Sequence, residues 1–450
     1  MLLVGPMEPP KGTLRVALIS PRGPLYKHRG GIWKKSLRYA PLTLTTLAAL
    51  IPPELDAAVE VFDEGICNID LDLQADLIGI SAITGSAVRA YELADHFRAR
   101  GIPVVLGGVH PTLLPDEAQL HADSVVVGYA EETWPELLRD FRRGQLQPRY
   151  TQRPELCLSD LPFPRRELLP KWQYTTTHTF EATRGCIHRC DFCVVPSAWG
   201  RPIQKPVADV VADIRQTGGK KVIFVDLNMI ADLDYARALF SELVKLRIRW
   251  FGLVTTLIAR DPELLSLAAR SGCRGVLIGF ESLSKASLAE TKKRFNDSVE
   301  YRHVIRELHR EGIAIMGCFV FGFDSDTKET FKETVDFVNS TGIDLPRYAI
   351  LTPFPNTGLF RRLHAEGRIL TEDWQWYDGQ HVVYRPSQLT AEELLRGTEW
   401  AWKETYRYRS IFRRIAISRI QIPLTVSCNL GYRFYAYNLS RFYTCQEFPV

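Results

Sequence analysis

The sequence lacks several features that would place the protein in a membrane or outside the cell. None of its apolar runs reaches the roughly 18 residues that a membrane-spanning helix needs, and residues 1–12 have no long apolar core of a secretory signal. The formal net charge is only +4 over 450 residues, which is too small to argue for a nucleic-acid partner. We therefore expect a folded protein of the cytoplasm that binds no nucleic acid.

Cysteine is also scarce, and its distribution argues against a disulfide framework. Of the nine cysteines, three are crowded together at Cys186, Cys190 and Cys193. Such crowding in a long chain is typical of metal ligation rather than of cross-linking. We expect the scattered cysteines to be small buried residues or inert thiols. They are Cys67, Cys157, Cys273, Cys318, Cys428 and Cys445.

Residues 12–145 alternate short apolar runs with amphipathic stretches, which indicates strands joined by helices in a parallel sheet. Helical spacing is clearest over 86–100, and 42–51 is a second helix candidate. The pattern predicts a doubly wound, Rossmann-like α/β domain, whose ligands bind beyond the carboxyl ends of the strands. The expected strands are 14–19, 59–62, 77–81, 104–106 and 124–127.

A second domain is expected after a proline-rich linker at 146–174. Residues 175–385 contain six apolar runs separated by helical patterns, which predicts a partial (β/α)6 barrel with its active site at the carboxyl-terminal mouth. Residues 386–450 are expected to form a helical C-terminal region. The expected barrel strands are 177–182, 222–225, 250–254, 276–278, 313–321 and 347–351, and the expected helices include 207–216, 235–246, 262–271 and 328–339.

The crowded cysteines lie on one short loop directly after the first expected barrel strand, with the spacing Cys-x3-Cys-x2-Cys. A four-iron cluster needs one soft ligand per iron, so three thiolates leave one iron open to a small molecule. This spacing resembles that of radical S-adenosylmethionine (SAM) enzymes. The resemblance implies a 4Fe–4S cluster that binds SAM at its open iron and cleaves it to a 5′-deoxyadenosyl radical. The alternative interpretation is a zinc site completed by His188.

The resemblance continues where later barrel strands are expected to end. Residues 279–282 are similar to the family's ribose-binding segment, and Glu281 is the expected acceptor from a sugar hydroxyl. Residues 226–228 follow the second strand where the family binds the methionine part of SAM, but the usual Gly-Gly-Glu is missing, so a purely structural role is equally compatible. Gly322, after the fifth expected strand, resembles the family's glycine near the adenine and is either a cofactor contact or a turn residue. The implied SAM-binding residues are Phe192, Asp226, Asn228, Glu281 and Gly322.

Within the first domain, residues 105–112 and 128–134 are similar to the cobalamin-binding half of cobalamin-dependent radical SAM enzymes. Glycine pairs there would admit a bulky corrin against the backbone. The chain resembles the hopanoid-type methylases and the anaerobic porphyrin-ester cyclase. Tyr26 replaces the aspartate that would orient His28 as a cobalt ligand, so we expect cobalamin to bind without a histidine on cobalt. The implied cobalamin-binding residues are Ser81, Gly107, Gly108, His110, Gly128 and Glu131.

The resemblance implies an enzyme that transfers a methyl group from methylcobalamin to an unactivated carbon of a small molecule. A radical cyclase or oxidative enzyme without net methylation is the first alternative, and a non-catalytic zinc- or cobalamin-binding sensor is the second. No sequence pattern identifies the substrate or the catalytic residues. A flavodoxin- or ferredoxin-type protein is the expected reductant.

The C-terminal region mixes aromatic and basic residues, and this mixture has two interpretations. The residues either pack against the barrel, or they lie on an anionic membrane, which would suit a lipid or pigment substrate. The aromatic residues are Trp400, Trp402, Tyr406, Tyr408 and Phe412, and the arginines expected at the membrane are Arg407, Arg413 and Arg414.

Overall fold

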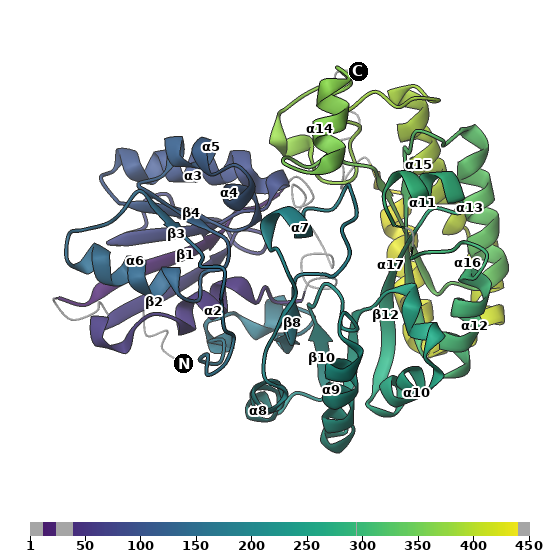
Figure 1. Ribbon diagram of the computed structural model, residues 1–450, viewed down its shortest axis with the longest axis horizontal. Helices are drawn as coiled ribbons and strands as arrows, with labels where there is room; N and C mark the ends of the chain where they lie inside the picture. The colour runs from purple at the N-terminus through teal and green to yellow at the C-terminus, as the bar shows by residue number, and fades with distance from the viewer. Residues whose placement is uncertain (1–11, 24–38, 294, 440–450) are drawn as a thin grey trace, which may run out of the picture. The chain divides into compact units, whose positions relative to one another are not determined.

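The computed structural model describes residues 12–23, 39–293 and 295–439. Tyr26 and His28 therefore lie outside the described residues. The chain forms two compact units, which in the described residues comprise 12–23 with 39–177 and 178–293 with 295–439 (Figure 1).

The first unit is a parallel α/β sheet. Within its described residues, six strands pair side by side in the order β2-β1-β3-β4-β5-β6. Helices α2 and α6 pack together on one face, where Leu44 and Trp134 belong to one buried cluster. The strands are β1 (Leu14–Ser20), β2 (Ala57–Asp63), β3 (Leu77–Ser81), β4 (Val104–Gly107), β5 (Ser124–Val127) and β6 (Arg149–Thr151). The helices are α2 (Thr43–Ala49), α3 (Ala87–Ala99), α4 (Val109–Leu113), α5 (Pro115–His121) and α6 (Thr133–Arg142).

This order confirms the predicted Rossmann-like fold, and it adds a strand that the sequence pattern did not reveal. Strand β6 pairs with β5 in parallel, although its residues fall inside the expected linker at 146–174. The first unit continues to Thr177, so this stretch belongs to it as a whole. The four-part division at 145, 174 and 385 stays a prediction.

The second unit is a partial barrel of parallel strands wrapped by helices. Its described residues contain a six-stranded sheet in the order β14-β13-β12-β11-β10-β7, with every neighbouring pair parallel. All six predicted strands are present, which confirms the (β/α)6 prediction. The strands are β7 (Thr179–Phe180), β8 (Thr183–Arg184), β9 (Ile203–Gln204), β10 (Lys221–Phe224), β11 (Arg249–Leu253), β12 (Cys273–Glu281), β13 (Ala314–Phe321) and β14 (Leu345–Ile350).

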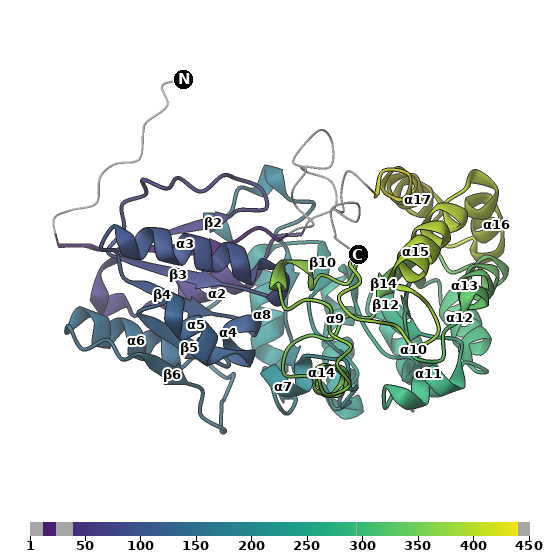
Figure 2. The ribbon, with the colours of Figure 1, turned by 90° about the horizontal axis from the view of Figure 1, so that it is seen from above.

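Helices cover the outer face of this sheet, and the last three lie next to β14 and α13 (Figure 2). The helices of the unit are α7 (Val195–Ala198), α8 (Val207–Thr217), α9 (Leu233–Leu246), α10 (Pro262–Arg270), α11 (Lys285–Glu290), α12 (Tyr301–Arg310), α13 (Lys328–Thr341), α14 (Gly358–Ala365), α15 (Ala391–Thr405), α16 (Tyr408–Ser418) and α17 (Ile422–Ala436). Among the described residues, no helix is long and apolar enough to cross a bilayer.

The C-terminal helices correct part of the membrane prediction. Trp402 and Tyr406 are buried against the barrel, so these two aromatic residues are packing elements. Arg414 is also buried and donates hydrogen bonds to Asn339 on α13 at 3.0 Å and to Asn429 on α17 at 2.6 Å. A buried guanidinium cannot contact a lipid headgroup, and the inclusion of Arg414 among the membrane-binding arginines was wrong.

Candidate active site at the mouth of the barrel

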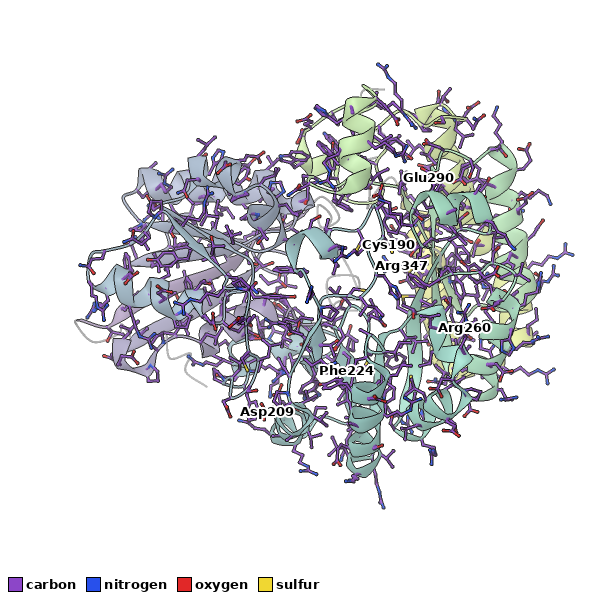
Figure 3. The ribbon with its side chains drawn as sticks, in the orientation of Figure 1. Cys190, Asp209, Phe224, Arg260, Glu290 and Arg347 are labelled. Carbon is purple, nitrogen blue, oxygen red and sulfur yellow. The ribbon has the colours of Figure 1, made fainter. Side chains whose placement is uncertain are left out.

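The three clustered cysteines lie on a loop that a small sheet closes at its base. Strands β8 and β9 pair antiparallel immediately before and after residues 185–202, and Lys205 N–H donates to the Ala182 carbonyl at 2.9 Å. Cys190, labelled in Figure 3, is on this loop just before α7. The loop therefore begins and ends at one point beside the carboxyl end of β7, where a barrel enzyme places its chemistry.

The thiols of the loop interact with one another in a partly buried environment. The pKa of Cys190 is raised to about 12, mainly by burial, with Lys293 lowering it and the neighbouring Cys193, Glu281 and Cys186 adding to the rise. Burial also raises the pKa of Cys193. Iron binds thiolates rather than thiols, so cluster assembly must release these protons. Three soft ligands on one loop are the number that a four-iron cluster with one open iron requires.

His188, the residue that a zinc site would need, is turned toward an aromatic ring. Its imidazole stacks on Phe295 with ring centroids 3.7 Å apart, and burial lowers its pKa. The described part of the chain has no group of three or more His, Cys, Asp or Glu side chains placed to hold a metal ion. The assignment of a cluster therefore depends on the loop motif and on comparison with known proteins.

Asp191 ties the cysteine loop to two other segments. Its carboxylate accepts a hydrogen bond from Lys292 Nζ at 2.9 Å, and its backbone N–H donates to the Thr291 carbonyl at 3.0 Å. On the other side, Leu359 N–H at the start of α14 donates to the Asp191 carbonyl at 3.0 Å. A side chain on Gly358 would collide with the Asp191 carboxylate, which explains the glycine at that position.

Glu281 stands at the end of β12, where the strand bulges. The register with β13 shifts between Gly279 and Glu281, and Glu281 has φ +64°, in the left-handed region. Its carboxylate folds back over Gly279 and pairs with Lys293 Nζ at 2.5 Å, and both side chains are buried. Burial alone lowers the pKa of Lys293, but the charge and hydrogen bond of Glu281 raise it above its usual value. A charged, oriented carboxylate at this strand end fits a ribose-binding role.

Asp226 and Asn228 occupy the end of β10 but have different environments. Both Asp226 oxygens accept hydrogen bonds from Ala182 N–H, and one accepts from Thr183 N–H at 2.5 Å, so this carboxylate fixes the segment that leads into the cysteine loop. Burial raises the pKa of Asp226 to about 7. Asn228 is equally buried, and its Nδ2 has no hydrogen-bond partner among the described residues. A buried orphan donor is costly, so the geometry favours Asn228 over Asp226 as a SAM contact, and both assignments stay predictions.

Gly322 and Phe192 are accounted for by packing within the second unit. Gly322 has φ +109°, and the space of a side chain there is taken by the Tyr384 hydroxyl and Leu394. Tyr384 donates a hydrogen bond to the Gly322 carbonyl. Phe192 is partly buried and packs against the barrel core. This packing gives no evidence for or against contact with SAM, so both assignments stay predictions.

The carboxyl edge of the first sheet brings the predicted cobalamin residues together. Ser81 pairs with Gly107 in the β3–β4 register. Gly108 has φ +97°, and a Cβ there would lie 2.7 Å from the Ala82 carbonyl oxygen. A Cβ on Gly107 would meet only Val126, at 3.6 Å. Gly108 is therefore needed by the protein's own backbone, and Gly107 is the glycine with room for a ligand against it.

The remaining predicted cobalamin residues lie in the same unit. A side chain on Gly128 would overlap Gln152, which accepts a hydrogen bond from Tyr129 N–H at 2.7 Å. His110 is fully buried and lies 3.2 Å from Glu117 through its Nε2, as expected of a core histidine. Glu131 is also buried. Half-exposed small residues at a strand edge fit cobalamin, whereas His110 has a structural explanation.

Sequence reasoning missed Lys292 and Lys293, which connect the cysteine loop and Glu281 at the mouth of the barrel. Lys292 holds the cysteine loop through Asp191, and Lys293 holds Glu281. They occupy adjacent positions in a charged stretch that has the pattern of an ordinary exposed turn. The only signal in the sequence was that they follow Glu281 by about a dozen residues, and no general rule assigns a role to that spacing.

Comparisons with known proteins place these two units in one family. Residues 180–338 match the radical SAM superfamily and residues 54–138 match the B12 binding domain. The chain is 34% identical over 389 residues to the bacteriochlorophyllide d C-12(1)-methyltransferase of Chlorobaculum tepidum, covering 83% of this chain and 84% of the relative. The chain belongs to the radical SAM enzymes that carry a B12-binding domain. The family's cofactors are a 4Fe–4S cluster, SAM and cobalamin.

Further relatives of this radical SAM enzyme agree with the assignment. It is 32% identical over 391 residues to the bacteriochlorophyllide d C-8(2)-methyltransferase of the same organism, covering 81% and 86% of the two chains. The hopanoid C-2 methylase of Rhodopseudomonas palustris is 27% identical over 350 residues, covering 74% and 66%. The solved structure of the cobalamin-dependent radical enzyme OxsB matches with a TM-score of 0.66 at 15% identity, covering 96% of this chain and 74% of that one, and shows the shared fold.

Proposed function

We propose that this enzyme methylates an unactivated carbon of a tetrapyrrole pigment in a cobalamin-dependent radical reaction. The proposal is supported by two features in one chain: three thiols and an ion-paired Glu281 at the barrel mouth, and a glycine-lined strand edge in the B12-binding domain. The pigment is supported by two relatives above 30% identity that are bacteriochlorophyllide d methyltransferases.

The residues of the barrel mouth have distinct tasks in this proposal. The cluster and SAM supply a 5′-deoxyadenosyl radical and methylcobalamin supplies the methyl group. Cys186, Cys190 and Cys193 hold the irons, and Glu281, oriented by its ion pair with Lys293, accepts hydrogen bonds from the ribose. Asp226 fixes the base of the cysteine loop. These groups act by holding reactants in a defined geometry, which is where most of the protein's contribution to such chemistry lies.

Anaerobic turnover with SAM labelled in its methyl group tests the proposal. The holoenzyme is supplied with bacteriochlorophyllide d and a low-potential reductant, and the pigment is analysed by mass spectrometry. Labelled methyl on the pigment together with 5′-deoxyadenosine supports methylation. Deoxyadenosine with an oxidised or cyclised, unlabelled pigment would instead establish the cyclase alternative, which a 24% identical porphyrin-ester cyclase from Cereibacter sphaeroides makes worth measuring.

The proposed partners follow from the same chemistry. We assign the reducing electron to a flavodoxin- or ferredoxin-type protein and place the enzyme in the cytoplasm, because an oxygen-sensitive cluster requires a reducing compartment. Peripheral membrane contact is part of the proposal: residues 405–439 contain six arginines and no Asp, Glu or Lys, and exposed Tyr408, Phe412 and Phe434 lie among them. Flotation with anionic liposomes should show binding that weakens with salt and is reduced in Arg409→Glu/Arg413→Glu.

A further inference from the structure

Two segments that are far apart in the sequence hold the cysteine loop from different sides. Asp191 N–H donates to the Thr291 carbonyl at 3.0 Å, and Leu359 N–H donates to the Asp191 carbonyl at 3.0 Å. Further along the loop, the Ser197 hydroxyl donates to the Asn356 carbonyl at 3.0 Å. The loop is therefore bonded to the residue that follows α11 and to the start of α14.

Arg362 joins these two segments. It lies about one helical turn after Leu359 on α14, and its Nη2 pairs with Glu290 Oε1 at 2.7 Å. Glu290, labelled in Figure 3, is the last residue of α11 and is followed directly by Thr291. These contacts close a ring, here called the Asp191 ring, whose members are Asp191, Thr291, Glu290, Arg362 and Leu359.

Asp324, which follows β13, fixes the orientation of the arginine. Its oxygens accept hydrogen bonds from Arg368 at 2.5 Å, Ser387 Oγ at 2.7 Å and Arg362 Nη1 at 2.7 Å. Burial alone raises the pKa of this carboxyl, but these hydrogen bonds hold it well below its usual value. Because Glu290 and Asp324 each engage one Nη of Arg362, the planar guanidinium has a fixed orientation. Helix α14 cannot move away from α11 without breaking an ion pair.

The segment that follows α11 also holds the expected ribose acceptor. Residues 290–293 provide two members of the Asp191 ring and end in Lys293, whose Nζ pairs with Glu281 at 2.5 Å. Within the described residues, the backbone hydrogen bonds that tie residues 186–193 to other segments both involve Asp191. The separation between the cysteine loop and Glu281 therefore depends on the Asp191 ring.

We propose that Arg362 is a positioning residue: by closing the Asp191 ring, it sets the distance between the cluster on the cysteine loop and the Glu281 carboxylate. SAM must reach the open iron and this carboxylate at once, and in such chemistry a misplacement of about 1 Å can cost about 100-fold in rate. Arg362 lies beyond the last barrel strand, outside every motif described above. The inference rests on the proposed function, in which the cysteines bind the cluster and Glu281 binds SAM.

Hydrogen exchange of the anaerobic holoenzyme tests the first step of this inference. The Asp191 and Leu359 amides are donors in the Asp191 ring. Arg362→Gln should speed their exchange by about tenfold, because it removes a charge-assisted hydrogen bond that holds the ring closed. Mass spectrometry of the peptides that contain these amides measures the change. Arg362→Lys can keep one of the two ion pairs and should recover part of the protection.

SAM binding tests the second step. Arg362→Gln should still hold about four irons per chain, because its three thiolates remain. Its SAM dissociation constant should rise about tenfold, and the paramagnetic spectrum of the reduced cluster with SAM should change. Glu290→Gln weakens the same ion pair at similar side-chain volume. It should shift exchange, affinity and spectrum in the same direction, which keeps the test available if Arg362→Gln does not fold.

Arg396→Gln is the matched control, because it removes an exposed Arg–Glu pair on α15, where Arg396 Nη2 lies 2.6 Å from Glu392. It should leave ring exchange, SAM affinity and spectrum unchanged. Unchanged exchange in Arg362→Gln and Glu290→Gln would overturn the inference, and so would faster exchange with unchanged SAM affinity and spectrum. A wild type that lacks iron or does not bind SAM would overturn the proposed function and the inference together.

Discussion

The ligand-binding edges proposed for the two sheets of this enzyme are built in opposite ways. At the barrel mouth, thiols, carboxylates and ammonium groups converge, and Glu281 with Lys293 forms a buried ion pair. At the carboxyl edge of the B12-binding sheet, the absence of side chains is what matters, because Gly108 and Gly128 have no room for one. One edge works through side-chain chemistry and the other through backbone shape. Substitutions should therefore fail differently at the two edges.

The largest effect is expected at the cysteine loop. Changing Cys186, Cys190 or Cys193 to Ser should abolish the roughly four irons per chain and all SAM cleavage, because each thiolate neutralises one iron. Iron content and the brown absorbance of anaerobic protein measure the loss. Cys157→Ser, at an exposed thiol of the other unit, is the control and should bind iron normally. A fully loaded cluster in any of the three variants would contradict the ligand assignment.

The next effect is expected at the ion pair. Lys293→Met leaves the buried Glu281 carboxylate without its partner, and breaking such a pair costs about 3–5 kcal/mol. Stability should fall, and the SAM dissociation constant should rise, in isothermal titration of the anaerobic protein.

Glu281→Gln in the same titration should raise the SAM dissociation constant at least severalfold without loss of iron. The double variant Glu281→Gln/Lys293→Met decides whether the residues act together. If its effect on SAM binding is smaller than the sum of the two single effects, the residues are coupled. Strict additivity would mean that Lys293 does not act through Glu281.

At the other edge the predicted effect is steric and smaller. Gly108→Ala places a Cβ at φ +97° within 2.7 Å of a backbone oxygen, which should cost of order 1–3 kcal/mol in thermal unfolding. Gly107→Ala has room and should be nearly neutral. If cobalamin lies against Gly107, then Gly107→Phe should lose cobalamin while keeping its unfolding temperature. Retained cobalamin in Gly107→Phe would remove this glycine from the binding edge.

The smallest effect is expected from His28→Ala. Tyr26 stands where an aspartate would orient the imidazole, so His28 should not ligate cobalt. The visible and paramagnetic spectra of bound cobalamin should be the same in the variant and in the wild type. A nitrogen ligand that disappears in His28→Ala would show that the B12-binding edge also uses side-chain chemistry, which would weaken the contrast between the two sheets.

The contrast also explains what could be predicted from the sequence. The strands of both sheets are strongly apolar and their positions were predicted, except for β6, whose Arg-Tyr-Thr has one apolar residue. The cysteine loop is local in sequence, so its motif was recognisable. Lys293 acts through Glu281 at the end of β12, and only the fold brings these two side chains together. That the backbone also needs a glycine at position 108 could not be predicted, because the close approach of Ala82 is a property of the folded chain.

The buried Arg414 has a consequence for how the enzyme unfolds. Through Asn339, Asn429 and the Thr405 carbonyl it joins α13 of the barrel to α15 and α17. Detaching α13, α15 or α17 would take one of these acceptors away from a buried guanidinium, so the helices cannot separate at low cost. Native-state hydrogen exchange should therefore report one cooperative unit for α13, α15 and α17. The C-terminal helices, which the sequence predicts as a region separate from the barrel, should unfold only when the barrel does.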